Sequence, residues 1–346
     1  MLGPFHAVSV SFSAMRLKLY LQVFLIRIIG IVIRQINTLI DRYFTSRKVL
    51  GPVFTVTIPA KLSKRPGNVS LYFYLPRGYT RSSLARSSKK DWPLVVNFHG
   101  GGFTIGHPTD DSLWATALLN DVDAVFVSVG YRKGPEHPQP TAVEDCVDAV
   151  RWLWAHAEEY GLDRSRTVIT GFSAGGNLSF TTPLRHYRER KAEDAEMVAQ
   201  DGKFTGIVAF YPSVNQAIPR QQKMDSNPIS KTKGSEPPWL HRMIDNSYYQ
   251  NLPPEGRASL NLSPALAPKD ALQNALPEKI AIFTCEWDKL LVEAEDFRKE
   301  LKAIGKIVGG EMIMNVGHGF DKRVRKYAKE RHSMYREAVK QIKTMV

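Results

Sequence analysis

The chain has 346 residues, of which 43% are hydrophobic and 23% charged, so it can bury a full core in one large domain with appended elements. The net charge of +13 raises nucleic acid or an anionic membrane as a partner. No base-stacking or groove-reading motif accompanies the basic residues, which argues against nucleic acid and leaves the membrane open. The two cysteines, Cys146 and Cys285, lie in apolar segments and predict neither a disulfide framework nor metal ligands, which favours an intracellular location.

The N-terminal segment, residues 1–48, is expected to stand apart from a domain at 49–346. Residues 16–44 are rich in Leu, Ile, Val and Phe, lack proline, and predict a helix. At about 100° per residue its polar positions share one sector of about 80°: Arg16, Arg27, Arg34, Asn37 and Asp41. The arginines disfavour a spanning helix, and no small-residue cleavage site supports a signal peptide. We expect this helix either to lie in a membrane interface with its arginines toward headgroups, or to fold over the domain as part of a cap.

Runs of β-branched and aromatic residues alternate with helical patterns through the rest of the chain, as in the helix expected at 141–159. This alternation predicts an α/β fold, with a mostly parallel sheet covered by helices on both faces. A proline-punctuated segment, 213–264, is expected to form a cap insertion. Eight strands are expected, near 53–59, 70–76, 93–98, 123–129, 166–170, 205–211, 279–285 and 310–316.

A glycine run follows the expected strand at 93–98, in the sequence His-Gly-Gly-Gly of residues 99–102. A turn without side chains can aim backbone N–H groups into a cleft at the end of a strand. In an ester hydrolase the N–H groups of Gly101, Gly102 and Ala174 would form an oxyanion hole, and losing one such donor costs about 3–4 kcal/mol of transition-state stabilisation. Taken alone, the motif could also be only a tight loop.

The sequence Gly-Phe-Ser-Ala-Gly of residues 171–175 directly follows the expected strand at 166–170. It has the form of a nucleophile elbow, in which flanking glycines allow a sharp strand-to-helix turn and leave the hydroxyl of Ser173 exposed. The motif is short and occurs by chance in many chains. It therefore supports a catalytic serine only if the sequence also contains a histidine and an acid that could act with Ser173.

Two such partners follow in chain order, each just past an expected strand. Asp288 follows the strand at 279–285, and His318 follows the strand at 310–316. A serine hydroxyl needs a histidine to take its proton and a carboxylate to orient that histidine, and serine, acid, histidine is the order found in α/β-hydrolases. Glu286 lies two residues before Asp288 and is an alternative acid.

Four ordered segments, 99–103, 128–138, 171–177 and 317–320, resemble the hormone-sensitive-lipase-like family of α/β-hydrolases, and the similarity extends over roughly residues 70–345. The resemblance implies an α/β-hydrolase fold with an eight-stranded sheet and a helical cap. It implies roles for seven residues: nucleophile, acid and base for Ser173, Asp288 and His318, oxyanion donors for Gly101, Gly102 and Ala174, and loop support for His99.

Within the 128–138 segment, Arg132 and Glu136 are expected to brace the loop and not to touch substrate. The chain departs from the family at Gly130 and Phe172, where aspartate is common. Gly130 removes a side chain that could have braced the loop, and Phe172 puts an apolar ring beside the nucleophile.

The expected activity is a serine carboxylic-ester hydrolase that acts through an acyl-enzyme on short- to medium-chain or small-metabolite esters, with no cofactor and no metal. An amidase or formamidase is the alternative within the same chemistry. A non-catalytic receptor is the alternative from another class, because the plant gibberellin receptor resembles this family while lacking the catalytic histidine; His318 disfavours it. The expected location is the cytoplasm or the surface of a membrane such as the endoplasmic reticulum, and the sequence does not reveal the oligomeric state.

Overall fold

The computed structural model describes residues 4–44, 49–79, 91–193, 201–234, 236–250, 252–323 and 326–346, and describes side chains on the first helix only for residues 16–36. Its strands form one sheet in the order β1-β2-β4-β3-β5-β6-β7-β8, with β9 pairing beside β7. The β1–β2 and β2–β4 pairs are antiparallel and all the others are parallel. The strands are β1 Phe54–Pro59, β2 Asn68–Tyr74, β3 Trp92–Phe98, β4 Val125–Gly130, β5 Leu162–Phe172, β6 Phe204–Phe210, β7 Lys279–Cys285, β8 Ile307–Gly309 and β9 Met312–Ile313.

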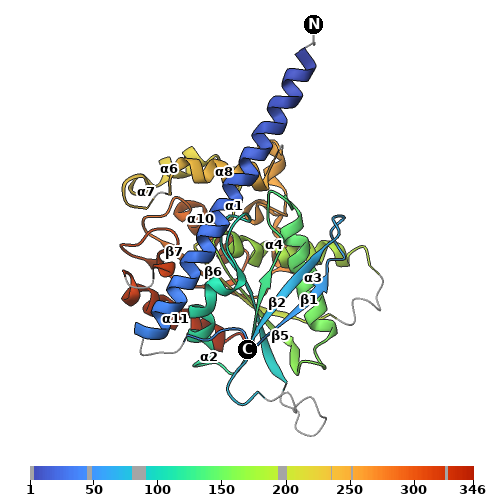
Figure 1. Ribbon diagram of the computed structural model, residues 1–346. Helices are drawn as coiled ribbons and strands as arrows, with labels where there is room; N and C mark the ends of the chain where they lie inside the picture. Colours follow the sequence, from blue (N-terminus) through green and yellow to red (C-terminus); the bar gives the residue numbers. More distant parts are fainter. Residues whose placement is uncertain are drawn as a thin grey trace.

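Helices cover both faces of the sheet (Figure 1). Successive side chains of β3 alternate between two buried clusters, with Leu94 and Val96 in one and Val95 in the other. The first cluster is closed by α3 Thr141–Ala155, α4 Ala174–Arg190 and α10 Leu291–Ala303, and the second by α2 Ser112–Leu119 and α11 Ala328–Lys343. A strand that is buried on both sides in this way is typical of a parallel α/β sheet, as expected from the sequence.

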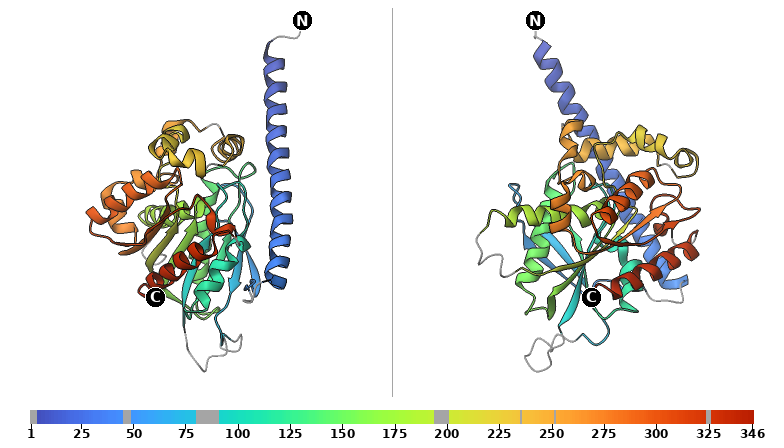
Figure 2. Two further views of the ribbon diagram at one scale, coloured as in Figure 1. Left: turned by 90° about the vertical axis from the view of Figure 1, so that its left-hand side faces the viewer. Right: turned by 180° about the vertical axis from the view of Figure 1, so that it is seen from behind.

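A group of short helices between β6 and β7 lies beyond one end of the strands (Figures 1 and 2). It occupies most of the expected cap insertion, and we call it the cap segment. The end it covers is the carboxyl end of β3, because Ile244 on α8 lies against the Gly102 position. The elements are α6 Arg220–Ser226, α7 Ile229–Lys233, α8 Pro238–Tyr248 and η3 Pro254–Ala258, followed by η4 Pro264–Leu266 and α9 Lys269–Ala275.

The last strand differs from the expectation. Residues 310–316 do not form one strand, because Gly310 takes a φ of +81° and a side chain there would meet the carbonyl oxygen of Ile282 at 2.2 Å. The chain instead divides into β8 and β9, and the sheet has nine strands within the described residues. The helix expected at 141–159 ends four residues earlier, at Ala155. Both cysteines are free and buried, as expected.

The C-terminal basic run, residues 322–331, is only partly exposed. Lys322 lies in the turn η5 Phe320–Lys322 and pairs with two buried carboxylates, while α11 begins six residues later and buries Arg331. Arg323, Lys326 and Lys329 are exposed, as a solvated face requires.

The N-terminal helix α1, Pro4–Phe44, runs along the outside of the domain, and its N-terminal end projects past the cap segment (Figure 2). Two of its arginines point inward: Arg27 binds Glu136 and Arg34 binds Asp110. The expectation that these arginines face lipid headgroups is therefore wrong, because acidic and carbonyl partners in the domain satisfy them. Asn37 and Asp41 lie outside the described side chains.

Candidate active site

The expected nucleophile elbow is present between β5 and α4. Ser173 has φ 55° and ψ −112°, a strained conformation that turns the chain sharply from strand to helix. The turn leaves no room for side chains at its two glycines: a Cβ on Gly171 would lie 2.2 Å from the carbonyl oxygen of Gly175, and one on Gly175 would lie 1.8 Å from that of Phe98. The motif's glycines are therefore required by close backbone approach, and they hold the hydroxyl at the end of the sheet.

The structure brings the three distant residues of the expected triad together. Nε2 of His318 lies 2.8 Å from Oγ of Ser173, and its Nδ1 lies 2.6 Å from Oδ2 of Asp288. Because a carboxylate can only accept, Nδ1 must donate to Asp288, which leaves Nε2 free to accept the serine proton. Ser173 and His318 are partly exposed, whereas Asp288 is buried. The arrangement can activate a serine for attack on a carbonyl carbon.

The acid loop holds Asp288 in place and keeps Glu286 away. The backbone N–H of Leu290 donates to the second oxygen of Asp288 at 3.0 Å, and the side chain of Asn227 donates to the carbonyl of Asp288 at 2.8 Å. Glu286 instead accepts from the backbone N–H of Asn315. Of the two acids that the sequence left open, Asp288 alone contacts the histidine.

The cap segment supplies a polar cluster beside this loop that the sequence reasoning missed. Oε2 of Glu236 lies 2.9 Å from Nε2 of His241 and 2.6 Å from Nζ of Lys289, the residue after Asp288. Burial lowers the pKa of His318, but the charge and hydrogen bond of Asp288, with the charge of Glu236, outweigh burial and raise this pKa above 6.5. No sequence motif marks Glu236, because its contact with this loop is made only by the fold.

The glycine loop passes directly beside the nucleophile. A Cβ on Gly100 would lie 3.6 Å from the Cβ of Ser173. Gly101 and Gly102 both have positive φ, +113° and +59°, and a Cβ on Gly102 would lie 2.7 Å from the side chain of Ile244 on α8. The N–H of Ala174, at the first position of α4, has no acceptor within its own helix. The glycine loop and the first residue of α4 thus lie on either side of Ser173.

His99 supports the glycine loop, as expected. Its Nδ1 donates to the carbonyl of Gly100 at 2.7 Å, and its ring stacks on Tyr131, whose hydroxyl donates to the carbonyl of His99 at 2.8 Å. Burial and the charge of Lys133 lower the pKa of His99 to about 3, so the ring is neutral at pH 7. A neutral, stacked imidazole fixes the start of the loop without adding charge beside the nucleophile.

Arg132 and Glu136 brace their loop, as expected. Arg132 forms a buried pair with Asp145 of α3 at 2.7 Å, and its guanidinium also donates to the carbonyl of Arg65. Glu136 forms an ion pair with Arg27 of α1. Both side chains therefore connect the loop to other elements and stay away from the serine.

Phe172, the departure next to the nucleophile, has a charged partner. Its ring stacks on Phe210, and Nζ of Lys322 lies 3.6 Å from the ring centroid. Lys322 also pairs with Asp111 at 2.6 Å and with Asp321 at 3.0 Å. The two carboxylates raise the pKa of Lys322 against the effect of burial, so the cation over the ring is maintained.

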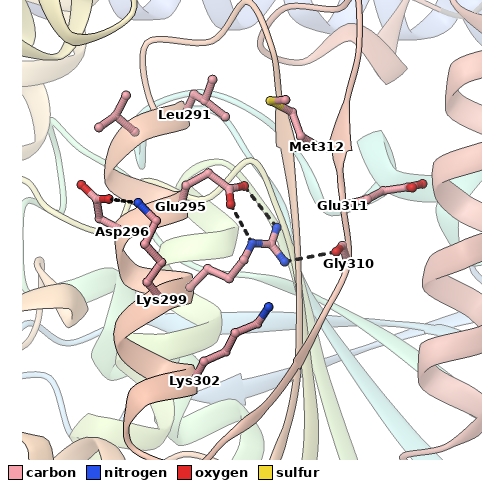
Figure 3. Close-up of a pocket in the computed structure, with 10 residues that line it drawn as sticks. Leu291, Glu295, Asp296, Lys299, Lys302, Gly310, Glu311 and Met312 are labelled. Carbon is pink, nitrogen blue, oxygen red and sulfur yellow. Dashed lines mark hydrogen bonds and ion pairs between the residues drawn. The ribbon is translucent and has the colours of Figure 1, made fainter.

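A surface groove of about 510 Å³ lies elsewhere, between α10 and the β8–β9 region (Figure 3). None of the triad residues lines it, and Arg298 within it already donates to the carbonyls of Gly309 and Ile282. These hydrogen bonds join α10 to β7 and β8, so the guanidinium of Arg298 has a structural role in the groove. Within the described ranges, no three His, Cys, Asp or Glu side chains are grouped so as to hold a metal ion.

The sheet order, the elbow after β5 and the cap segment before β7 define an α/β-hydrolase. The α/β hydrolase fold family matches residues 95–322, more than half of the chain, so the chain belongs to this family, and within it to the hormone-sensitive-lipase-like group. The resemblance noted in the sequence and the expected fold class are confirmed.

Named relatives are carboxylic ester hydrolases. LipN of Mycobacterium tuberculosis, a carboxylic ester hydrolase, is 32% identical over 232 residues, which cover 66% of this chain and 57% of LipN. Probable carboxylesterase 1 of Arabidopsis thaliana is 33% identical over 156 residues, 42% of this chain and 46% of that protein. The chain's matches thus span about half the length of these curated relatives.

Solved structures of esterases share the fold. A hyperthermophilic esterase from Pyrobaculum calidifontis has a TM-score of 0.71 and 25% identity, covering 93% of each chain. Carboxyl esterase 2 from Tuber melanosporum has a TM-score of 0.71 and 21% identity, covering 88% of this chain and 89% of that one. The second likeness concerns the fold alone.

Proposed function

We propose that this protein is a serine carboxylic-ester hydrolase with Ser173 as nucleophile, His318 as base and Asp288 as the orienting acid. The observation that carries the proposal is the continuous hydrogen-bonded chain from Ser173 through His318 to Asp288, with distances of 2.8 and 2.6 Å. The raised pKa of His318 supports it, because a base must hold the proton during the reaction.

The reaction proceeds in two halves. Oγ of Ser173 attacks the ester carbonyl carbon while His318 takes the serine proton. The N–H groups of Gly101, Gly102 and Ala174 donate hydrogen bonds to the carbonyl oxygen as it becomes negatively charged. His318 then gives the proton to the departing alcohol, leaving an acyl-serine. Water, activated by the same histidine, attacks the acyl group, and the acid is released as Ser173 regains its proton.

The proposed substrates are uncharged esters of short to medium chain length, including small-metabolite esters. The cap segment supports this class, because it brings apolar side chains to the oxyanion loop: Ile244 lies against Gly102, and the ring of Tyr248 stacks on Phe103 at 4.1 Å. Trp239, at the start of α8, is 51% exposed.

Turnover of p-nitrophenyl esters of increasing acyl length tests the proposal. We expect wild type to be fastest on the shorter chains, Ser173→Ala to be inactive, and Ser165→Ala, at an exposed serine, to keep full activity. A fluorophosphonate should label wild type and Ser165→Ala but not Ser173→Ala. Binding of esters with neither labelling nor turnover would indicate a receptor, and faster cleavage of matched aryl amides than of esters would indicate an amidase.

A further inference from the structure

The outer surface of α1 has an unusual concentration of exposed apolar side chains. Eleven of the seventeen large hydrophobic residues exposed in the described part of the chain lie on this one helix. Residues 16–36 are long and apolar enough to cross a membrane by length and composition alone. The exposed residues are Leu17, Tyr20, Leu21, Phe24, Leu25, Ile28, Ile29, Ile31, Val32, Ile33 and Ile36. We call ten of them the outer face of α1, leaving out Tyr20, whose hydroxyl contacts the domain.

The opposite side of α1 is fixed to the domain at several points. Arg27 donates to the carbonyls of Thr104 and Gly134 at 2.6 to 3.0 Å and pairs with Glu136 at 2.9 Å. Arg34 pairs with Asp110 at 2.6 Å, and Val23 is buried. The inward arginines therefore set which side of the helix faces out, and that side is mostly apolar, with Lys18 and Gln35 as exposed polar residues near its two ends.

The outer face is too wide for one protein partner. At about 100° per residue, its side chains occupy an arc of about 200° around the helix axis, whereas a helix packed against protein buries a stripe on the order of 100°. A second copy of the chain would leave much of this arc in water. A bilayer surface surrounds a partly immersed helix and can cover an arc of this width.

The same contacts argue against spanning by residues 16–36, the stretch long and apolar enough to cross a membrane. The attached stretch from Tyr20, whose hydroxyl donates to the carbonyl of Pro135, to Arg34 is about 21 Å long. A bilayer core is about 30 Å thick, so a helix crossing it would have to release Arg27 and Arg34 from their partners and place both in hydrocarbon.

We propose that the outer face of α1 docks on an anionic lipid bilayer. The helix lies in the plane of the membrane surface, and the domain stays in water on the opposite side of the helix. The net charge of +13 favours approach to an anionic surface. The proposal does not depend on ester hydrolysis, since no residue of the outer face belongs to the triad or the glycine loop.

Vesicle sedimentation with the full chain tests the proposal. The probe is a vesicle of phosphatidylcholine and phosphatidylserine. We expect wild type and Ser173→Ala to pellet equally, and the triple variant Leu21→Gln, Leu25→Gln, Val32→Gln to lose at least tenfold in its vesicle partition coefficient. Alkaline carbonate should release the bound wild type, as expected for a helix that does not span.

The matched control changes three equally exposed apolar residues away from α1: Leu266→Gln, Ile307→Gln and Met314→Gln. This variant should pellet like wild type, and both triple variants should keep wild-type turnover of a water-soluble ester, which verifies folding. The proposal is overturned if wild type stays in the supernatant, if both triple variants bind alike, or if bound protein resists carbonate. It is also overturned if wild type is a dimer that the α1 triple variant converts to monomer without any vesicle binding.

Discussion

Replacing Asp288 with asparagine tests the proposed chemistry most directly, because the structure fixes how the amide must sit. One carboxylate oxygen accepts from the N–H of Leu290 at 3.0 Å and the other faces Nδ1 of His318 at 2.6 Å. An amide that keeps the bond to Leu290 must place its oxygen there and turn its NH2 group toward Nδ1. That ring nitrogen then accepts, the proton moves to Nε2, and His318 can no longer take the proton of Ser173.

The size of the effect follows from the lost charge as well. The imidazolium charge is spread over the ring, so its centre lies about 4 Å from the carboxylate, where a charge pair is worth about 4 kcal/mol at an effective dielectric constant of 20. This corresponds to roughly a thousandfold in rate, to which the wrong tautomer adds. We therefore expect kcat/KM of Asp288→Asn on p-nitrophenyl acetate to fall at least about 10³-fold.

The matched control is Glu286→Gln, the acid two residues earlier, which accepts only from the backbone N–H of Asn315 in the described contacts. It should retain near-wild-type kcat/KM, and both variants should unfold at similar temperatures. A loss of less than tenfold in Asp288→Asn, or an equal loss in Glu286→Gln, would refute the assignment of Asp288 as the orienting acid.

Three further changes probe the surroundings of the triad. Gly102→Ala, at φ +59° and against Ile244, should lower kcat/KM roughly 10²-fold by displacing an oxyanion donor, while stopped-flow binding of substrate changes little. Glu236→Gln removes a negative charge that stabilises protonated His318, so the pKa of His318 should fall and the acid limb of the pH profile of kcat/KM should move to lower pH. Arg27→Gln should lower kcat roughly tenfold, because it frees the carbonyl of Thr104, two residues past the glycine loop, and so loosens that loop. It should not weaken vesicle sedimentation.

The sequence predicted the sheet well because its strands are buried on both faces and therefore read as apolar runs. It predicted the positions of Ser173, Asp288 and His318 for a related reason, since parallel strands bring their carboxyl ends to one edge of the sheet. Each of these residues follows the apolar run of a strand, so their convergence could be expected without coordinates. Distance along the chain, up to 145 residues between Ser173 and His318, does not weaken this inference.

Other features depended on contacts that no local pattern encodes. The break at Gly310 arises because Ile282, from a neighbouring strand, occupies the space of a side chain. Glu236 reaches Lys289 only because the cap segment folds back onto the acid loop. Lys322 looked like part of a solvated run, yet Asp111, far away in sequence, draws it into a buried network beneath the nucleophile's neighbour Phe172.

For the N-terminal helix, the periodicity of the sequence predicts some features and leaves others open. Spacing at about 100° per residue correctly places Arg27 and Arg34 on one side of the helix. It does not indicate whether that side or the opposite side packs against protein. The orientation is decided by partners elsewhere in the chain, since Glu136 and Asp110 offer charges that water or headgroups would otherwise supply. Once the polar side is satisfied by the domain, the apolar side has no protein to cover it in the described structure. An arginine-bearing amphipathic helix can thus present its apolar side to lipid, the reverse of the orientation that its charges first suggest.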